Sequence, residues 1–215
     1  GGGAAKPAGR PLPGVVGRRL RTGVVIRRRA DSMAQVWGTR TYRFRNPHGI
    51  ETGTLKFTVS NEKDDAIKIA LEQVLDGHAL AQEIVCARDS RLSLIRFANT
   101  VNGETREQTF DPKTPTPNRT THLVTLLLAG TLPEEYRGVT MYGEPGREAE
   151  PVSLEVVGPE SREIDGKQTD VTKVIKKDVG GGEMNVWIDS AGVVLLIEGK
   201  VGRVELVPKA PDPAK

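Results

Sequence analysis

The stretch RLSLIRFANTVNGETREQTF, residues 91–110, places the pair Asn102-Gly103 between two β-rich runs. Two further pairs, Asp76-Gly77 and Asp165-Gly166, stand in the same kind of setting. Both residues of such a pair accept a positive φ, which the two-residue type I′ hairpin turn requires. A fourth turn, Asp189–Gly192, joins two of the most apolar runs in the chain. Four hairpins in one chain predict an antiparallel meander built from locally paired strands.

The segment before Asp76 fits two patterns. Its apolar residues recur at intervals of three and four, as on one face of a helix that Gly77 would end. Several of them also alternate with other residues, as in a strand. The Asp76-Gly77 pair and the alternating run that follows it favour a hairpin over a helix. The helical pattern contains Ile67, Ala70, Leu71, Val74 and Leu75, and the alternating pattern contains Ile67, Ile69, Leu71 and Leu75.

One helix is expected, at about residues 120–130. The residues before it, 111–118, carry prolines at 112, 115 and 117, which exclude a helix interior and a central strand. Thr120 or Thr121 can cap the start of the helix, and Gly130 can end it. The run Leu123–Leu128 is too apolar for a helix with one wet face, so we expect this helix to be buried on more than one side.

These elements predict a mainly β protein. A sheet of about 11 to 12 strands curls or closes rather than staying flat, so we expect a curled antiparallel meander or an incomplete β-barrel. The 120–130 helix is expected to pack on the concave side of that sheet. The chain then divides into a basic arm at 1–38, one β-rich domain at 39–207 and a Pro-rich tail at 208–215.

Charge is spread unevenly along the chain. Residues 1–30 hold eight of the 31 basic residues and no acidic one, which leaves 23 basic against 28 acidic residues in 31–215. Such an arm suits nucleic acid, an anionic surface or an acidic partner. The Pro, Gly and Ala content of residues 6–17 also fits a solvated leader. The arginines available for a partner are Arg18, Arg19, Arg21, Arg27, Arg28 and Arg29.

The residue inventory predicts no catalytic residue, metal site or cofactor. The histidines, His48, His78 and His122, stand far apart, and no zinc-ligand pair or nucleophile-elbow motif occurs. The single cysteine, Cys86, lies in a β-like run, where a free cysteine usually behaves as a small buried apolar residue. No apolar run reaches the roughly 20 residues that a membrane-spanning helix needs.

One late hairpin carries a resemblance to a known family. Trp187-Ile188-Asp189-Ser190-Ala191-Gly192, followed by Val193-Val194-Leu195, resembles the late hairpin of bacterial extracytoplasmic β-meander domains. These include domains near the LolA/LolB lipoprotein-carrier superfamily. The motif covers about residues 183–207, and the topology of a long sheet wrapped on a helix would cover 39–207. The resemblance implies a periplasmic or secreted protein that holds a lipid or acyl chain inside the curled sheet.

Two functions of different classes follow from these observations. The first is a non-enzymatic binding or carrier domain that encloses an apolar ligand, such as a lipid, between its sheet and helix. The alternative is a structural or protein-interaction module with a filled core, which contacts a partner through a sheet edge or the basic arm. Trp187 lies between Val186 and Ile188 and therefore faces away from them, towards a ligand, a partner or the core around a fully buried central hairpin. The residues expected to line a ligand cavity are Leu55, Phe57, Ile69, Leu71, Leu126 and Trp187.

Overall fold

The computed structural model describes residues 37–88, 93–111, 119–120, 122–130, 140–142 and 150–208. Within these residues the strands form one sheet, in the order β6-β5-β4-β3-β2-β1-β13-β12-β11-β10-β9-β8-β7. Two antiparallel meanders, β1 to β6 and β9 to β13, join where β13 pairs with β1. The prediction of a mainly β, antiparallel meander is therefore confirmed. The six arginines of the predicted basic arm lie outside the described residues.

The first meander consists of six strands connected by short turns. They are β1 (Gly38–Arg45), β2 (Glu51–Asn61), β3 (Ala66–Leu75), β4 (His78–Ala87), β5 (Leu94–Val101) and β6 (Glu104–Thr109). The second meander contains β9 (Glu150–Ile164), β10 (Lys167–Asp178), β11 (Glu183–Ile188), β12 (Val194–Gly199) and β13 (Gly202–Leu206). Two very short strands extend its end, β8 (Thr140–Tyr142) antiparallel to β9 and β7 (Arg119–Thr120) parallel to β8.

The predicted turns connect the strands as expected. Asp76, Asn102 and Asp165 have φ angles of 48°, 48° and 51°, and the glycines that follow them have 79°, 89° and 73°. Two successive positive φ angles are what the type I′ turn requires, and they match the twist of the paired strands. The segment before Asp76 is strand β3, paired along its whole length with β4. The hairpin interpretation of this segment is correct, and the helical one is wrong.

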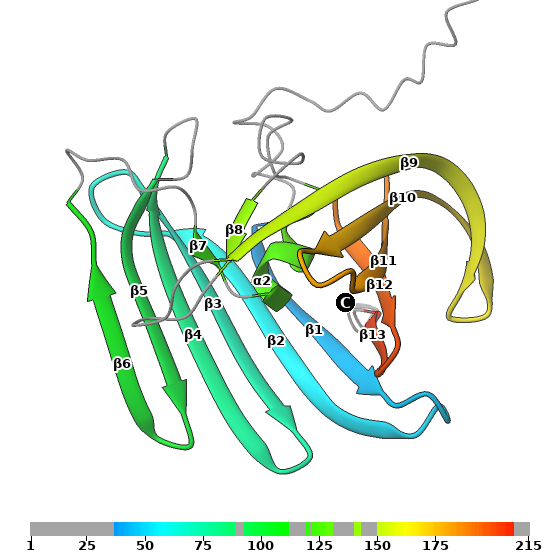
Figure 1. Cartoon of the computed structure of the whole chain (residues 1–215), viewed down its shortest axis with the longest axis horizontal. Coiled ribbons are helices and arrows are strands. Elements are labelled where there is room, and N and C mark those ends of the chain that lie inside the picture. The colour runs from blue at the N-terminus through cyan, green and yellow to red at the C-terminus, as the bar shows by residue number, and fades with distance from the viewer. Residues whose placement is uncertain are drawn as a thin grey trace, which may run out of the picture.

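The sheet bends around the middle of the molecule without closing into a barrel. Figure 1 shows β6 to β1 as one wall, with β13 to β9 turning away from it and α2 (His122–Leu127) between the two parts. Strands β6 and β7 are the two ends of the strand order. The incomplete closure that was expected from the number of strands is therefore seen in the described part of the chain.

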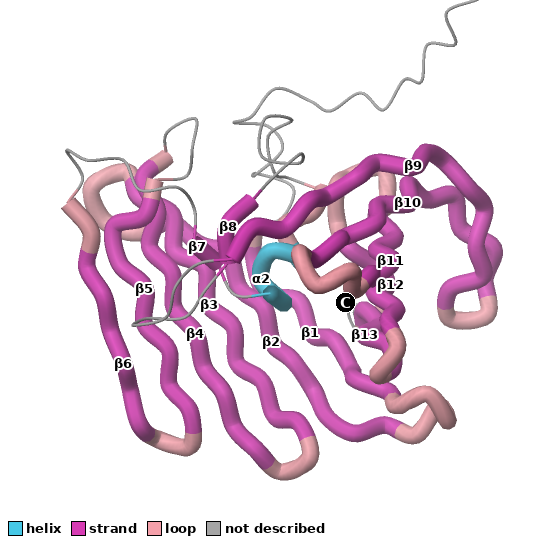
Figure 2. The backbone as a smooth tube through the Cα atoms, viewed as in Figure 1, coloured by secondary structure: helices cyan, strands magenta, loops and turns pink. Residues whose placement is uncertain are grey.

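The helix is much shorter than predicted. Of the described residues in 120–130, Thr120 belongs to β7, residues 122–127 form α2, and 128–130 form a turn (Figure 2). The segment contains three threonines and one valine, residue types that favour a helix only weakly. At its end, a Cβ on Gly130 would meet the backbone oxygen of Gly192 at 2.2 Å. Close packing on the β11–β12 turn, rather than a regular helix, therefore fixes the path of this segment.

The main core lies on one face of the sheet, here called the inner face. Along β2, the buried residues Leu55, Phe57 and Val59 alternate with exposed or half-exposed ones. The same alternation continues into β3 with Ile67, Ile69 and Leu71. We call the hydrophobic cluster on this face the main cluster, and it contains side chains from both meanders and from the α2 segment. The opposite side of the sheet is here called the outer face.

Candidate functional site

Five of the six residues predicted to line a ligand cavity lie together on the inner face. Leu55, Phe57, Ile69, Leu71 and Leu126 all belong to the main cluster. The exposed fraction of each of these side chains is at most 1%. Packed neighbours therefore surround all five side chains. Two sequence patterns predicted their burial, the alternation along β2 and β3 and the apolar run at 123–128.

The α2 segment fills the space between the two meanders. We call residues 122–130 the plug. Val124, Leu126 and Leu128 are completely buried, and Leu127 and Ala129 are 2% exposed. Because the plug has apolar side chains that pack with both meanders in the main cluster, it occupies the position that an apolar ligand of the curled sheet would need.

Trp187 lies apart from the other five predicted residues. It packs with Val171 and Leu196 in a separate hydrophobic group, which we call the second cluster. In the sheet Trp187 is directly opposite Lys173 on β10 and Leu196 on β12, so all three side chains share the outer face. Trp187 therefore cannot line a cavity with Leu55 and Leu126, because the sheet itself lies between them.

The far half of the β9–β10 hairpin, residues 158–171, covers Trp187. From here on we call this half of the hairpin the arm, and it is distinct from the basic segment at residues 1–38. The register of the two strands shifts between Lys173 and Val174, and Gly158 has a φ of 141°. A bulge of this kind bends a strand, and glycine tolerates the backbone angle. The Arg162 guanidinium then lies 3.8 Å from the Trp187 ring centroid, and Trp187 Nε1 donates a hydrogen bond to Glu160. The alternation of Trp187 indicates that its side chain faces away from the main cluster, but nothing in the sequence shows that the arm covers it.

A buried cation borders the main cluster. Lys176 is completely buried on the inner face of β10, opposite Leu154 on β9 and Met184 on β11. Its ammonium pairs with the Asp178 carboxylate, which is 29% exposed. Burial lowers the pKa of Lys176, and the hydrogen bond that its ammonium donates to the Asp178 carboxylate opposes part of that effect. Sequence reasoning missed this residue because lysine is normally an exposed side chain.

Three other polar side chains also face the interior. The Tyr42 hydroxyl donates a hydrogen bond to the Val194 carbonyl at 3.1 Å, and burial raises the pKa of this phenol well above its ordinary value. Gln82 Nε2 donates to Asn99 Oδ1 at 3.4 Å between β4 and β5. These bonds satisfy polar groups that would otherwise be costly to bury. The Tyr42 bond connects β1 with β12 across the intervening β13, and the Gln82 bond connects the neighbouring strands β4 and β5.

The single cysteine and the three histidines lie at separate places in the chain. Cys86 is buried within the main cluster, as expected for an apolar cysteine. His48 and His78 are exposed at turns, and the side chain of His122 lies outside the described structure. Nowhere among the described residues do three or more His, Cys, Asp or Glu side chains gather to hold a metal ion. In the same part of the chain, no helix has the length and apolar composition of a membrane span.

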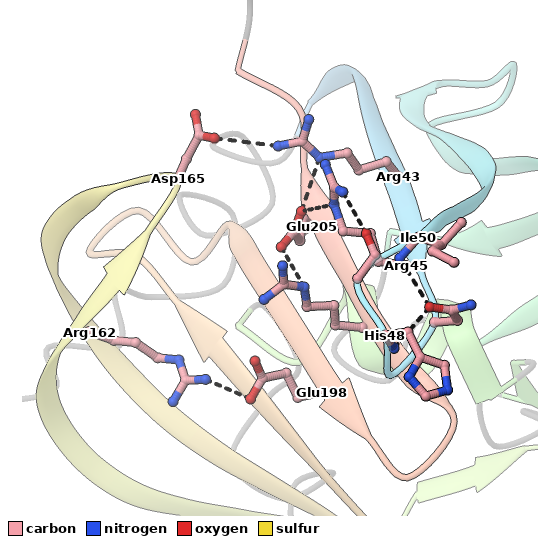
Figure 3. Close-up of polar contacts among 11 residues, drawn as sticks. Arg43, Arg45, His48, Ile50, Arg162, Asp165, Glu198 and Glu205 are labelled. Carbon is pink, nitrogen blue, oxygen red and sulfur yellow. Dashed lines mark hydrogen bonds and ion pairs between the residues drawn. The ribbon is translucent and has the colours of Figure 1, made fainter.

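A charged group on the outer face links β1 with β13 (Figure 3). Arg43 and Arg45 each donate through Nε to Glu205 Oε2 at 3.0 Å, and Arg203 Nε lies 2.8 Å from Glu205 Oε1. Arg43 also reaches Asp165 at the tip of the arm, at 3.4 Å. The alternating run Thr41-Tyr42-Arg43-Phe44-Arg45 predicts a strand that has Arg43 and Arg45 on the same face. No comparable pattern in the sequence pointed to Arg203 and Glu205.

Comparisons with protein-family models, with curated proteins and with solved structures find no match to this chain.

Proposed function

We propose that this chain is a non-enzymatic carrier domain that takes up an apolar ligand, such as a lipid or acyl chain, in place of the plug. The observation that carries the proposal is the position of the plug. A short apolar segment is buried between two meanders of one sheet that is open at its ends. An apolar chain that replaced Val124, Leu126 and Leu128 would meet the same side chains that the plug now covers.

Energetics support exchange of this kind. A buried apolar side chain contributes about 1.5–3 kcal/mol through the hydrophobic effect, and an acyl chain offers about 0.8 kcal/mol for each buried CH₂. A ligand can therefore compensate for the loss of plug contacts. The helical part of the plug has only six residues, which is too short for a helix to be stable by itself. Its position thus depends on the contacts that the ligand would replace.

Native mass spectrometry of protein purified from its source, followed by solvent extraction, tests the proposal. A co-purifying lipid that solvent removes is the expected result. A titration with a fluorescent fatty acid adds a test by mutation. Leu126→Ala should bind the probe about tenfold more tightly, because the truncated plug loses packing energy and is easier for the ligand to displace. Leu196→Ala, an equal truncation in the second cluster, should leave the affinity unchanged.

The alternative is a structural or protein-interaction module with a permanently filled core. The observation that favours it is the near-complete burial of Leu55, Phe57, Ile69, Leu71 and Leu126. In that case the purified protein has its bare mass, and the fluorescent probe binds neither the original chain nor Leu126→Ala. That outcome would contradict the carrier proposal.

A further inference from the structure

A continuous row of side chains crosses the outer face of the sheet. Each residue in the row lies directly opposite the next on the neighbouring strand, and such pairs share one face of the sheet. The row begins under the arm, passes through the charged group of Figure 3 and ends on β4. Its members are Lys173, Trp187, Leu196, Glu205, Arg43, Thr54, Val74 and Ala79.

The charged part of this row brings three arginine side chains to one carboxylate. Arg45 on β1 lies directly opposite Arg203 on β13, and like charges in that position destabilise a strand pair. Both arginines, together with Arg43, converge on the Glu205 carboxylate. With Asp165 included, three guanidinium groups pair with two carboxylates, while Glu51 lies directly opposite Arg45 and Glu198 directly opposite Arg203. Guanidinium groups bind phosphate and carboxylate through several parallel hydrogen bonds.

The end of the row beyond Arg43 lies in an open groove of about 480 Å³. Small side chains form most of its floor, and Val74 is 50% exposed. Lys56 and Glu72 also line the groove, but they pair at 3.6 Å and so neutralise each other. Arg43 borders the groove because two of the lining residues, Thr41 and Thr54, are its neighbours along β1 and across to β2.

We infer that this part of the outer face binds a small elongated organic anion, a chain that ends in one phosphate or carboxylate. The anion binds the guanidinium groups of Arg43, Arg45 and Arg203. The chain lies across β2, β3 and β4 on Thr54, Val74 and Ala79. From β1 to β4 the floor spans three strand spacings, about 14 Å, which suits a medium-length alkyl chain. The site is on the opposite face from the plug, so it does not depend on the carrier proposal.

Calorimetric titration with inorganic phosphate and with octyl phosphate, below the concentration at which micelles form, tests the site. Both should bind, and octyl phosphate should bind about tenfold more tightly, which is the effect of burying about two methylene groups in the groove. Raising the salt concentration should weaken the binding of both, because exposed charges are screened. If neither probe binds, or if octyl phosphate binds no better than phosphate, the inference is wrong.

Three variants separate recognition from a merely structural role. Arg203→Gln should weaken both probes at least fivefold. Glu205→Gln should tighten both severalfold, because it removes the carboxylate that competes for the three arginines, and a structural role alone gives no such gain. Ala79→Phe should block octyl phosphate and leave inorganic phosphate unchanged. Arg106→Gln on β6 is the matched control, since it removes an exposed arginine of the same sheet outside the site.

The experiment also distinguishes a free amphiphile from a membrane surface. Vesicles of neutral lipid with a minority of phosphatidic acid present the same anionic group on a surface. Binding of the monomeric probe in a one-to-one ratio supports the inference. Binding to the vesicles without binding to either soluble probe would overturn it, because the groove would then contribute nothing. Circular dichroism of each variant shows whether its sheet is intact before affinities are compared.

Discussion

The main cluster and the second cluster lie on opposite faces of one sheet, and each is covered in a different way. The main cluster is covered by the plug, which lies about midway along the chain between the two meanders. The second cluster is covered by the arm, a bent continuation of two of the sheet's own strands. The plug is a separate segment that packs against the sheet, whereas the arm is continuous with two of its strands. This difference predicts that the plug can exchange with a ligand and that the arm stays in place.

Truncation of the plug should have the largest effect on stability. Leu126→Ala removes a completely buried side chain and should lower the free energy of unfolding by about 2–5 kcal/mol. Urea denaturation followed by circular dichroism measures the change. Saturating fluorescent fatty acid should restore part of the loss, because a ligand that binds only the native state stabilises it. A loss below 1 kcal/mol would show that the plug contributes little and would weaken the contrast between the two covers.

The second cluster should respond less strongly. Trp187→Phe keeps an aromatic ring but removes the Nε1 donor to Glu160 and weakens the stacking of Arg162. The expected loss is about 1–2 kcal/mol, the sum of one hydrogen bond and part of one cation–π contact. Urea denaturation measures it as before, and fatty-acid affinity should not change. A change in that affinity would contradict the assignment of Trp187 to the outer face.

The two clusters also differ in how far the sequence alone could predict them. Alternation in Leu55, Phe57, Ile69 and Leu71 identified the inner face, because a two-residue period is a local property of each strand. The turn pairs gave the hairpins for the same local reason. The arm depends on a bulge at Gly158 and on contacts between residues far apart in the chain, such as Arg43 with Asp165. No local pattern specifies such contacts, so neither the cover of Trp187 nor the group around Glu205 could be predicted.

Each cluster has a cation at its border, and both cations should contribute to stability. Lys176 is buried with a lowered pKa, whereas Arg162 lies on the Trp187 ring and pairs with Glu198 at 2.6 Å. Lys176→Met removes the buried ammonium but leaves the buried Asp178 Oδ1 without its ion-pair partner, so it should lower the free energy of unfolding by about 1 kcal/mol at pH 7. Arg162→Met should also lower it, because the variant loses the ion pair with Glu198 and the contact of the guanidinium with the Trp187 ring.

The difference in stability between Lys176→Met and the original chain should depend on pH. The folded chain releases the Lys176 proton below the ordinary pKa of 10.5, while the unfolded chain still binds it. Between those two pKa values the original chain therefore gains stability as pH rises, and the variant does not. The deficit of the variant should therefore grow as pH approaches 10.5. Tyr42 and Lys177 titrate in both proteins, so their contributions cancel in the difference. A difference that is constant from pH 7 to pH 10.5 would contradict the lowered pKa.

The smallest effect is expected where the tip of the arm meets β1. Asp165→Asn removes the exposed ion pair with Arg43, whose atoms lie 3.4 Å apart. Exposed pairs contribute about 0–1 kcal/mol, so the free energy of unfolding should fall by less than 0.5 kcal/mol. Asparagine also accepts the positive φ of this turn position, so the hairpin itself should be unaffected. If the arm stays in place because of Trp187, the tryptophan fluorescence of Asp165→Asn will match that of the original chain at low and high salt. A red shift would mean instead that the ion pair holds the arm closed and that both covers are able to open.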